Sequence, residues 1–496
     1  MFWIGYDIGS SSIKAALIND KNGKTVGTAQ YPKVEMPIRS PKAGWGEQDP
    51  SSWWENLRIA TQQLLKETEV KASDIKGIGI SYQMHGLVLV DKQQQVLRPS
   101  IIWCDSRAVT TGEHLFQKAG SSKCEEQLLN SPGNFTLSKL KWVKDNEPEL
   151  YERVDKFMLP GDYIAMKLTG ACTTTPSGLS EGIAWDFTQH APADWLFKEA
   201  GIDTDLIPEI VSTFSEQGKV TQQAAEQTGL PVGIPVMYRA GDQPNNALAL
   251  NVFKPGEIAA TGGTSGVVYA ISEKVKTKES TRINSFAHVN HQKDAPRIGK
   301  MLCINGTGIQ YSWMRNQLTD AMDYASMNEL AASVAIGSDG LIILPFGNGA
   351  ERMLRNKNMG SSINNINFNI HQQKHLFRAA LEGIAFSFVY GLEILQGDGI
   401  TLDTIKAGND NLFRSEVFSN TIATLVGKDI SITETTGAVG AARAAAYASG
   451  AFSSFDEATA TDEVEHVYKP VDKYKQEYLA AFEQWKQCLE EQLHQQ

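Results

Sequence analysis

The pattern of apolar and polar positions in the first quarter of the chain predicts a small sheet followed by a helix. Apolar runs at 2–8 and 13–18 flank the short polar stretch 9–12, which predicts two strands joined by a turn. From Asp49-Pro50 onward, apolar residues recur at roughly helical spacing, so a helix is expected to begin there. Further apolar runs predict buried strands at 75–81, 87–90, 101–103 and 235–240. Strands that alternate with helices indicate an α/β protein.

A second unit with the same layout begins near residue 254. Residues 254–272 again give a strand, a glycine-rich turn and a strand, which repeats the layout of 2–18 in pattern though not in identity. The elements expected after it are a helix at 307–319, a strand at 341–346, a helix at 371–395, a strand at 404–407, a helix at 437–449 and a charged amphipathic helix from about 471 to 494. We therefore predict two α/β domains, 1–248 and 249–496, the second ending in the charged helix.

Composition and charge exclude several classes of protein. The 496 residues are 42% hydrophobic and 21% charged, which is ordinary for a soluble globular chain. The formal net charge of −11 argues against a protein built mainly to hold nucleic acid or an anionic membrane surface. The N-terminus lacks the basic segment of a signal peptide, no apolar run approaches ~18 residues, and the five cysteines are scattered. We expect a cytoplasmic protein with no nucleic-acid partner and no membrane partner.

Two turns built from small residues are candidates for binding phosphate. The segments Asp7–Ser12 and Thr261–Gly266 each follow an apolar run. Small residues let a phosphate approach the backbone, while N–H groups and hydroxyls such as Ser11 and Ser12 supply donors. Asp7 could hold a hydrated Mg²⁺. Each segment alone is more often an ordinary hairpin, but one in each half of the chain indicates a phosphate held between two domains.

Asp242 follows the expected strand at 235–240 directly. One interpretation is an Asx turn before a helix. The other is a carboxylate at a crevice between domains, placed to accept a proton from a hydroxyl. The pattern leaves both open.

A third group of residues combines an amide, an imidazole, an aromatic ring and a carboxylate. Gln83, Met84 and His85 lie between two expected strands, and Trp103 and Asp105 follow another. Such a set suits a polyol, which presents C–H faces and many hydroxyls. On pattern alone, structural roles for His85 and Trp103 are favoured.

Several longer motifs then identify a family. They are YDIGSSSIKA at 6–15, GWGEQDPSSWW at 44–54, IGISYQMHGLVLVD at 78–91, AGDQPNNALAL at 240–250, GGTSGVVYA at 262–270 and GAVGAARAAA at 437–446. On these residues the chain resembles the FGGY carbohydrate kinase family, and within it the xylulokinases. The resemblance implies an α/β fold of two actin-like (ribonuclease H-like) ATPase domains, each with a mixed five-stranded sheet, and an active site in the interdomain cleft.

The resemblance also implies roles for particular residues. Asp242 matches the catalytic base, which an Asp with an ordinary pKa near ~4 can fill because it is ionised at neutral pH. Asp7 matches the second catalytic acid, near Mg²⁺ and the γ-phosphate. The sugar contacts implied, besides Asp242, are Gln83, Met84, His85, Trp103 and Asp105. The ATP contacts expected are Ser11, Ser12, Gly262, Gly263, Thr264, Gly408 and Asn409.

The function implied is phosphoryl transfer from MgATP to the terminal hydroxyl of a ketopentose, with D-xylulose as the preferred candidate. The expected partner is therefore a small-molecule sugar, and a homodimer is possible. The alternatives are a kinase for L-ribulose, L-fuculose or a polyol, and a non-catalytic actin-like sensor of sugar or ATP. Residues 407–415 contain one glycine where xylulokinases have a run of glycines, which predicts altered contacts with the nucleotide.

Overall fold

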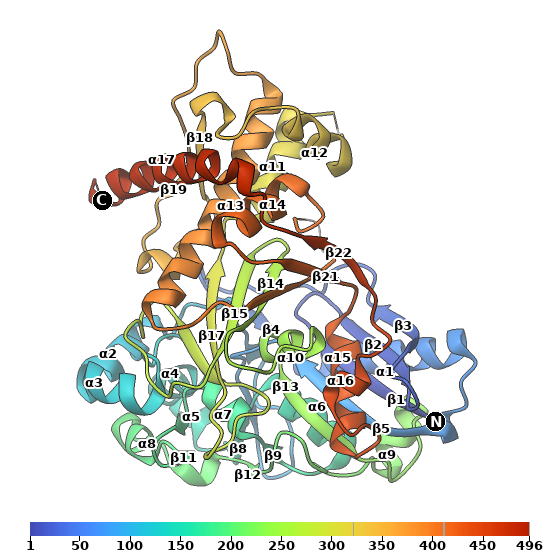
Figure 1. Cartoon of the computed structure of the whole chain (residues 1–496). Coiled ribbons are helices and arrows are strands. Elements are labelled where there is room, and N and C mark those ends of the chain that lie inside the picture. The colour runs from blue at the N-terminus through green and yellow to red at the C-terminus, as the bar shows by residue number, and fades with distance from the viewer. Residues whose placement is uncertain (321, 410–411, 496) are drawn as a thin grey trace.

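The computed structural model describes residues 1–320, 322–409 and 412–495 and contains two sheet-rich α/β domains (Figure 1). The sheet of the first domain has the strand order β13-β5-β1-β2-β3. Its strands are β1 (Phe2–Ile8), β2 (Ile13–Asn19), β3 (Thr25–Tyr31), β5 (Ile75–Tyr82) and β13 (Val236–Gly241). β1 pairs antiparallel with β2 and parallel with β5, so the sheet is mixed as expected.

The second sheet repeats this topology and extends it. Its order is β16-β17-β15-β14-β20-β21-β22. The strands are β14 (Glu257–Gly262), β15 (Gly266–Ser272), β16 (Asn284–Ala287), β17 (Ile298–Ile304), β20 (Thr404–Gly408), β21 (Ile430–Thr433) and β22 (Val464–Tyr468). β14 pairs antiparallel with β15 and parallel with β20, as β1 does with β2 and β5. The expected five strands are therefore present, and β16 and β22 add an antiparallel strand at each edge.

Helices and short strands complete the first domain. Helix α1 begins after Asp49, whose carboxylate accepts the Ser51 N–H, and it buries Trp53 and Leu57 on the sheet. The helices are α1 (Pro50–Thr68), α2 (Val109–Ala119), α3 (Ser121–Lys123), α4 (Thr136–Asn146), α5 (Pro148–Tyr151), α6 (Pro160–Thr169), α7 (Pro176–Glu181), α8 (Asp194–Ala200), α9 (Gln222–Thr228) and α10 (Asp242–Ala249). The short strands are β4 (Glu47–Gln48), β6 (Val88–Val90), β7 (Ser100–Ile101), β8 (Lys156–Met158), β9 (Thr173–Thr174), β10 (Trp185–Asp186), β11 (Ala191–Pro192) and β12 (Glu209–Ile210).

The second domain is built around one long helix. The further elements are α11 (Gly308–Leu318), α12 (Tyr324–Ala332), β18 (Ile342–Phe346), β19 (Gly360–Asn364), α13 (Gln373–Gly397), α14 (Glu416–Val426), α15 (Gly437–Ala448), α16 (Phe455–Ala458) and α17 (Lys475–His494). In the described part of the chain, α13 alone is long and apolar enough to cross a membrane by length and composition, but 83% of that window is buried. No unbroken apolar run of that length is visible in the sequence, because Glu382 and Glu393 interrupt the window, and Arg378 precedes it. Arg378 and Glu382 form a buried ion pair at 2.7 Å, so α13 packs as a core helix.

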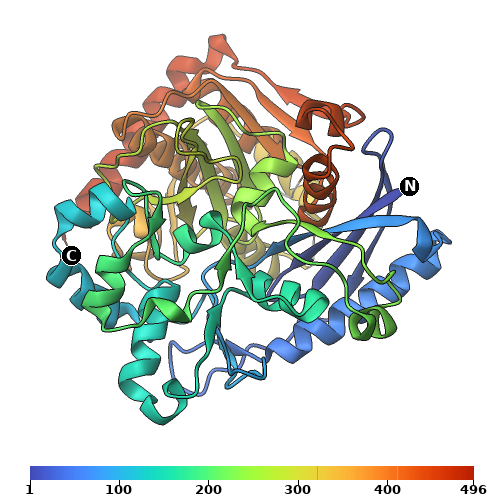
Figure 2. The ribbon, with the colours of Figure 1, turned by 90° about the horizontal axis from the view of Figure 1, so that it is seen from below.

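Helix α15 lies against the sheet of the first domain, although it comes from the last quarter of the chain (Figure 2). Two glycines of the sheet make this close approach possible. A Cβ atom on Gly79 would lie 1.9 Å from the carbonyl oxygen of Ala441, and one on Gly5 would lie 2.0 Å from that of Ala438. The backbone of α15 therefore rests directly on the strands.

Helices α10 and α15 pack against each other through small residues. A Cβ atom on Gly440 would lie 2.6 Å from the Cβ of Ala249, and the Asn245 amide donates to the carbonyl oxygen of Gly437 at 2.8 Å. The two helices follow β13 and β21, which hold equivalent positions in the two sheets. They form the contact at which the two halves of the repeat meet.

Candidate active site

The strand register brings three of the predicted residues to one edge of the first sheet. Gly241 of β13 lies opposite Tyr82 of β5, and Tyr82 lies opposite Ile8 of β1. Because these strands are parallel, Asp242, Gln83 and Asp7 meet at their carboxyl ends. Ligands of open α/β sheets bind at this edge.

Asp242 and Asp7 form a partly buried pair of carboxyl groups. Burial, and next the negative charge of Asp7, raise the pKa of Asp242 to about 7, although hydrogen bonds from Gln243 oppose this. Burial also raises the pKa of Asp7, against the charge of Lys14 and a 3.0 Å hydrogen bond from Ser81. The pKa near ~4 expected for Asp242 is therefore wrong here, because that value belongs to a solvated carboxyl.

This pair fits a hydrated magnesium ion. Within the described ranges, neither Asp7 nor Asp242 has a cationic partner within 4.0 Å, and no three His, Cys, Asp or Glu side chains gather as a metal site. Mg²⁺ is usually held by one or two carboxylates together with waters and substrate phosphates. Asp7 could therefore contribute to holding Mg²⁺, most of whose ligands would be water and phosphate.

His85 occupies the loop that follows β5. Its backbone is left-handed (φ 62°), and its Nδ1 lies 3.0 Å from the carbonyl oxygen of Glu181. Since a carbonyl only accepts, Nδ1 carries the proton and Nε2 is an acceptor. The ring packs against Phe135 and Phe286, with centroids 4.8 and 5.4 Å away. Burial, together with the charge of Lys139, lowers the pKa of His85 to about 3, so the imidazole is neutral.

Lys139 holds together the two loops that carry the predicted sugar contacts, one with His85 and the other with Trp103 and Asp105. Lys139 itself was not predicted from the sequence. Its ammonium group is buried and donates to the carbonyl oxygens of His85 (2.8 Å) and Ile102 (3.1 Å). Burial lowers its pKa to about 7, although the charge of Asp105 opposes the change. The sequence did contain a signal for this role, because Lys139 falls among the apolar positions that form the buried face of helix α4, next to Leu140.

Trp103 and Asp105 have different surroundings in the second of these loops. Trp103 is 53% exposed, and its indole N–H donates to the Ser10 hydroxyl at 3.3 Å, which joins the sugar loop to the first phosphate turn. Asp105 is fully buried, with its carboxylate bound by Arg107 (2.7 Å) and by the Gly46 N–H (2.7 Å). Asp105 thus shapes the loop, and its direct contact with a sugar stays a prediction.

Gln83 and Met84 are buried beside the strand ends. The Gln83 amide donates to Gln48 at 3.3 Å. A Cβ atom on Gly241 would lie 2.6 Å from Met84 Cγ and 2.7 Å from a carboxylate oxygen of Glu181, so only glycine fits before Asp242. Glu181 is a second residue that the sequence analysis missed. Burial raises its pKa well above the usual range, and the charge of Asp242 adds to this.

The first candidate phosphate turn, residues 9–12, is closed by a hydrogen bond from the Gly9 N–H to the carbonyl oxygen of Ser12 at 3.1 Å. Ser11 is exposed, whereas Ser12 is buried. The Ser11 carbonyl accepts the Met36 N–H at 2.8 Å, which fixes the turn from outside the hairpin. Ser11 is therefore the hydroxyl of this turn that is open to a ligand.

Helix α11 orients the second candidate phosphate turn, residues 262–266, in which Gly262 and Gly266 pair at the ends of β14 and β15. The N–H groups of Gly308 and Ile309 donate to the carbonyl oxygens of Gly263 (3.2 Å) and Thr264 (3.0 Å). Gly263 and Thr264 line a cavity of about 170 Å³ together with these first residues of α11. The predicted helix start at 307 was the signal for Gly308 and Ile309, which the sequence analysis did not assign to the site.

Gly408 and Asn409 follow at the end of β20, beside β14. A Cβ atom on Gly408 would meet nothing within 4 Å, so space is open there. The Asn409 side chain is bound to Glu465 (2.5 Å) and Arg414 (2.9 Å). Of the unusual segment 407–415, Asp410 and Asn411 lie outside the described residues. Leu412 lines the same cavity as Gly263 and Thr264, so this segment lies beside the second turn.

The chain has two sheets of the same topology, and each sheet carries a turn of small residues. Asp242 lies at the strand ends between them. This arrangement defines a two-domain actin-like phosphotransferase. Residues 2–249 match the N-terminal domain, and residues 258–449 the C-terminal domain, of the FGGY family of carbohydrate kinases. The chain belongs to this family, and it is a kinase that transfers phosphate to an alcohol group of a carbohydrate.

Relatives and solved structures cover nearly the whole chain. Xylulose kinase of Bacillus subtilis is 28% identical over 463 residues, covering 92% of this chain and 89% of the relative. Xylulose kinase of Escherichia coli is 28% identical over 444 residues, covering 90% and 88%. The crystal structure of xylulose kinase from Rhodospirillum rubrum is 28% identical, with a TM-score of 0.88 and coverage of 100% and 99%. The predicted fold and family are thereby confirmed.

Proposed function

We propose that this kinase transfers the γ-phosphoryl group of MgATP to the terminal hydroxyl of D-xylulose, giving D-xylulose 5-phosphate. The observation that carries the proposal is the position of Asp242. Asp242 begins helix α10 at the carboxyl ends of the strands, where the loop with His85 and the turn with Asp7 also lie. Its pKa is raised to about 7. The names of the relatives support the choice of sugar. The small soluble substrates also favour a cytoplasmic enzyme.

In this proposal Asp242 orients the sugar hydroxyl and takes its proton. Phosphoryl transfer has a loose transition state, so positioning and charge stabilisation supply most of the acceleration. A carboxylate whose pKa lies near the working pH is a better general base than one with an ordinary pKa near ~4. Asp242 is held at a fixed point because α10 begins with it.

The two turns hold the nucleotide in this proposal. Ser11 and Ser12 of the first turn and Gly262, Gly263 and Thr264 of the second contact the phosphates, and Gly408 and Asn409 lie toward the adenosine. Mg²⁺, when bound near Asp7, offsets the negative charge of the phosphate oxygens. Asp7 also keeps the pKa of Asp242 high.

The sugar is recognised by the two loops that Lys139 joins. His85 Nε2 accepts a hydrogen bond from a sugar hydroxyl, since Nδ1 is committed to Glu181. The exposed ring of Trp103 offers its face to the C–H side of the sugar. Met84, Gln83 and Asp105 shape this pocket from behind, where they are buried.

The choice of substrate is tested by comparing a panel of candidate phosphate acceptors. ADP release is followed with MgATP and D-xylulose, L-ribulose, L-fuculose or a polyol such as glycerol. We expect D-xylulose to give the highest kcat/KM, by at least tenfold. A higher kcat/KM for another compound of the panel would make that compound the proposed substrate. ATP hydrolysis that none of these compounds changes would favour a non-catalytic sensor of sugar or ATP.

Replacing His85 by Ala is expected to raise the KM for the sugar at least tenfold and to leave the KM for ATP within about twofold. The change removes one acceptor from a hydroxyl, which is worth about 1–2 kcal/mol. Steady-state kinetics with each substrate varied in turn measure both constants. His85→Gln, which keeps an acceptor, should recover part of the loss. Equal rises in the two KM values would contradict a sugar-contact role.

The value of kcat/KM should fall about fivefold from pH 7 to pH 6 and about tenfold for each further pH unit below that. The base works only as a carboxylate, and with a pKa of about 7 its ionised fraction drops from a half at pH 7 to roughly a tenth at pH 6. His85 stays neutral over this range because its pKa is about 3. The pKa of Glu351 is also raised to about 7, by burial, so the profile is repeated with Glu351→Gln. A flat profile between pH 5 and 7 would contradict the assignment of Asp242.

A further inference from the structure

A pocket of about 660 Å³ lies at the C-terminal ends of helices α10 and α15, which are the ends that point away from the active site. Asp242 begins α10, whereas Asn251, just past its other end, lines the pocket. Gly437 begins α15 close to Asp7, whereas Tyr447, in its last turn, lines the pocket. At 1.5 Å per residue these helices place the pocket roughly 12–18 Å from the carboxylates.

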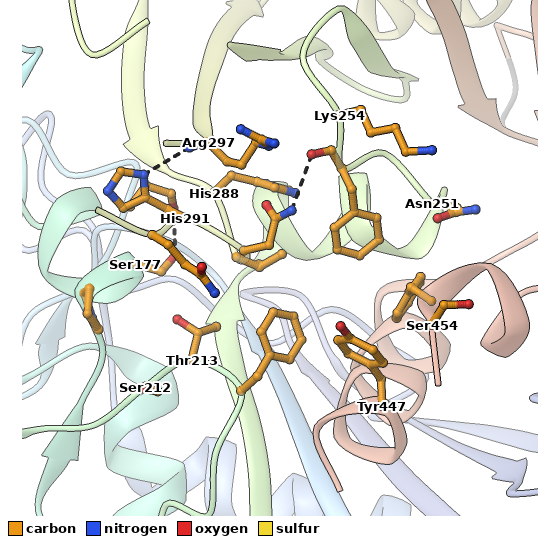
Figure 3. A pocket seen from close by; sticks show the side chains of 18 of the residues that line it. Ser177, Ser212, Thr213, Asn251, Lys254, His288, His291, Arg297, Tyr447 and Ser454 are labelled. Carbon is orange, nitrogen blue, oxygen red and sulfur yellow. Dashed lines mark hydrogen bonds between the residues drawn. The ribbon is translucent and has the colours of Figure 1, made fainter. Parts of the chain in front are cut away.

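The pocket is built from parts of the chain that are far apart in sequence. Besides α15, it takes segments from the first domain, from the connection between the two family-matched regions and from the loop between β16 and β17. Its lining includes Thr213, Phe253, His288 and Ser454 (Figure 3). A ligand seated there would touch both domains.

One wall is a row of aromatic rings. The centroids of Phe214 and Tyr447 are 5.6 Å apart, those of Tyr447 and Phe455 are 6.2 Å apart, and those of Phe455 and Phe253 are 4.9 Å apart. All four rings line the pocket. Such a row suits a flat, apolar group, which packs against ring faces and edges.

The pocket also carries cations that lack acidic partners. Within the described part of the chain, Lys254, Lys293 and Arg297 form no ion pair within 4.0 Å. Lys254 and Arg297 lie along one side of the pocket, opposite Thr213 and Tyr447 (Figure 3). A partly buried guanidinium with no acid beside it suits a carboxylate or phosphate ligand.

The two acids of the lining are engaged elsewhere. A carboxylate oxygen of Glu257 accepts the N–H groups of Phe253 (2.7 Å) and Lys254 (2.9 Å). Asp456 accepts the Asn251 amide at 2.7 Å. Both carboxylates keep their charge, but within the described residues neither forms an ion pair within 4.0 Å with Lys254, Lys293 or Arg297.

His291 adds a donor without a partner. Its Nδ1 accepts the Arg297 N–H at 3.1 Å, so the proton of the neutral ring lies on Nε2 (Figure 3). This Nε2 is buried and has no hydrogen-bond partner among the described residues. This nitrogen lies on the side of the ring away from the Arg297 side chain (Figure 3), so it is not assigned to a ligand of the pocket.

We propose that this pocket binds a small organic anion: a flat ring that carries a phosphate or carboxylate group. The ring packs on the row of aromatic side chains, and the anionic group is held by Arg297. The site is separate from the sugar and nucleotide sites. Because the proposal concerns binding alone, it stands or falls independently of the proposed sugar.

Phenyl phosphate is the probe, and its binding to the full chain is measured by calorimetric titration. ADP and the sugar that gives the highest kcat/KM in the substrate panel are present at saturating concentrations, so that the active site is filled. We expect one phenyl phosphate per chain. Phenol, which lacks the anion, and inorganic phosphate, which lacks the ring, should each bind at least tenfold more weakly.

Arg297→Gln should weaken the binding of phenyl phosphate at least tenfold and leave the kinase activity within twofold. Arg153→Gln, an exposed arginine outside the pocket, is the matched control and should bind like the original chain. The proposal is overturned if phenyl phosphate does not bind at millimolar concentration, if Arg297→Gln binds it as tightly as the original chain does, or if inorganic phosphate binds equally well.

Discussion

Replacing Asp242 by Asn is expected to lower kcat for sugar phosphorylation at least 10³-fold, within the range that general bases contribute. Asn matches Asp in size, so α10 should begin at the same residue, but the amide cannot take a proton. Burial, and next the negative charge of Asp7, raise the pKa of Asp242 to about 7, and a neutral amide avoids both of these costs. The folded state should therefore be at least as stable as the original.

Three measurements separate this role from a structural one. Kinetics give kcat, thermal unfolding reports the folded state, and calorimetric titration with ADP reports the nucleotide site. We expect loss of turnover with unchanged unfolding temperature and ADP affinity. Asp105→Asn is a useful comparison, because that carboxylate is buried against Arg107 and should act through stability and sugar KM. Turnover within tenfold of the original in Asp242→Asn would remove Asp242 as the base.

Replacing Gly79 by Ala is expected to destabilise the protein by about 3 kcal/mol or more. The new methyl group would lie 1.9 Å from the carbonyl oxygen of Ala441, so helix α15 must move away from the sheet. That movement opens the packed contact of the alanine-rich helix with β1 and β5. It also shifts Gly437, for which a Cβ atom would lie 2.8 Å from an Asp7 carboxylate oxygen, so kcat should fall as well.

Urea unfolding followed by circular dichroism measures the free energy of unfolding. Gly397→Ala is the matched control, because a Cβ atom there meets nothing within 4 Å and its backbone is not left-handed. The control should stay within about 0.5 kcal/mol of the original. A Gly79→Ala chain as stable as the control would mean that α15 does not rest on the sheet at this point.

Local sequence patterns predicted the elements that carry strong, continuous signals. The apolar run at 2–8 is β1, Asp49-Pro50 begins α1, and the alanine-rich stretch is α15 at Gly437–Ala448. The repeated layout near 254 is the β14–β15 hairpin. These predictions succeeded because turns, caps and hydrophobic spacing are set by neighbours along the chain.

Features that depend on distant residues could not be predicted in this way. Strand β17 was missed because Gly299 and Lys300 interrupt its apolar run, and Lys300 is neutralised by Asp398 at 3.1 Å, nearly a hundred residues later. The pKa of Asp242 depends on burial and on Asp7, which only the sheet register brings close. Lys139 and Glu181 likewise gain their roles from loops that meet in space.

The position of α15 has a consequence for synthesis of the chain. Gly5 and Gly79 leave the ribosome well before residues 437–448, which cover them and follow about 190 residues after position 248. At ordinary translation speeds this is a delay of roughly 10–40 s. During that interval an apolar face of the sheet is uncovered. The nascent chain should therefore depend on chaperones, and a fragment that stops at 248 should precipitate unless a peptide spanning 437–458 is supplied in trans.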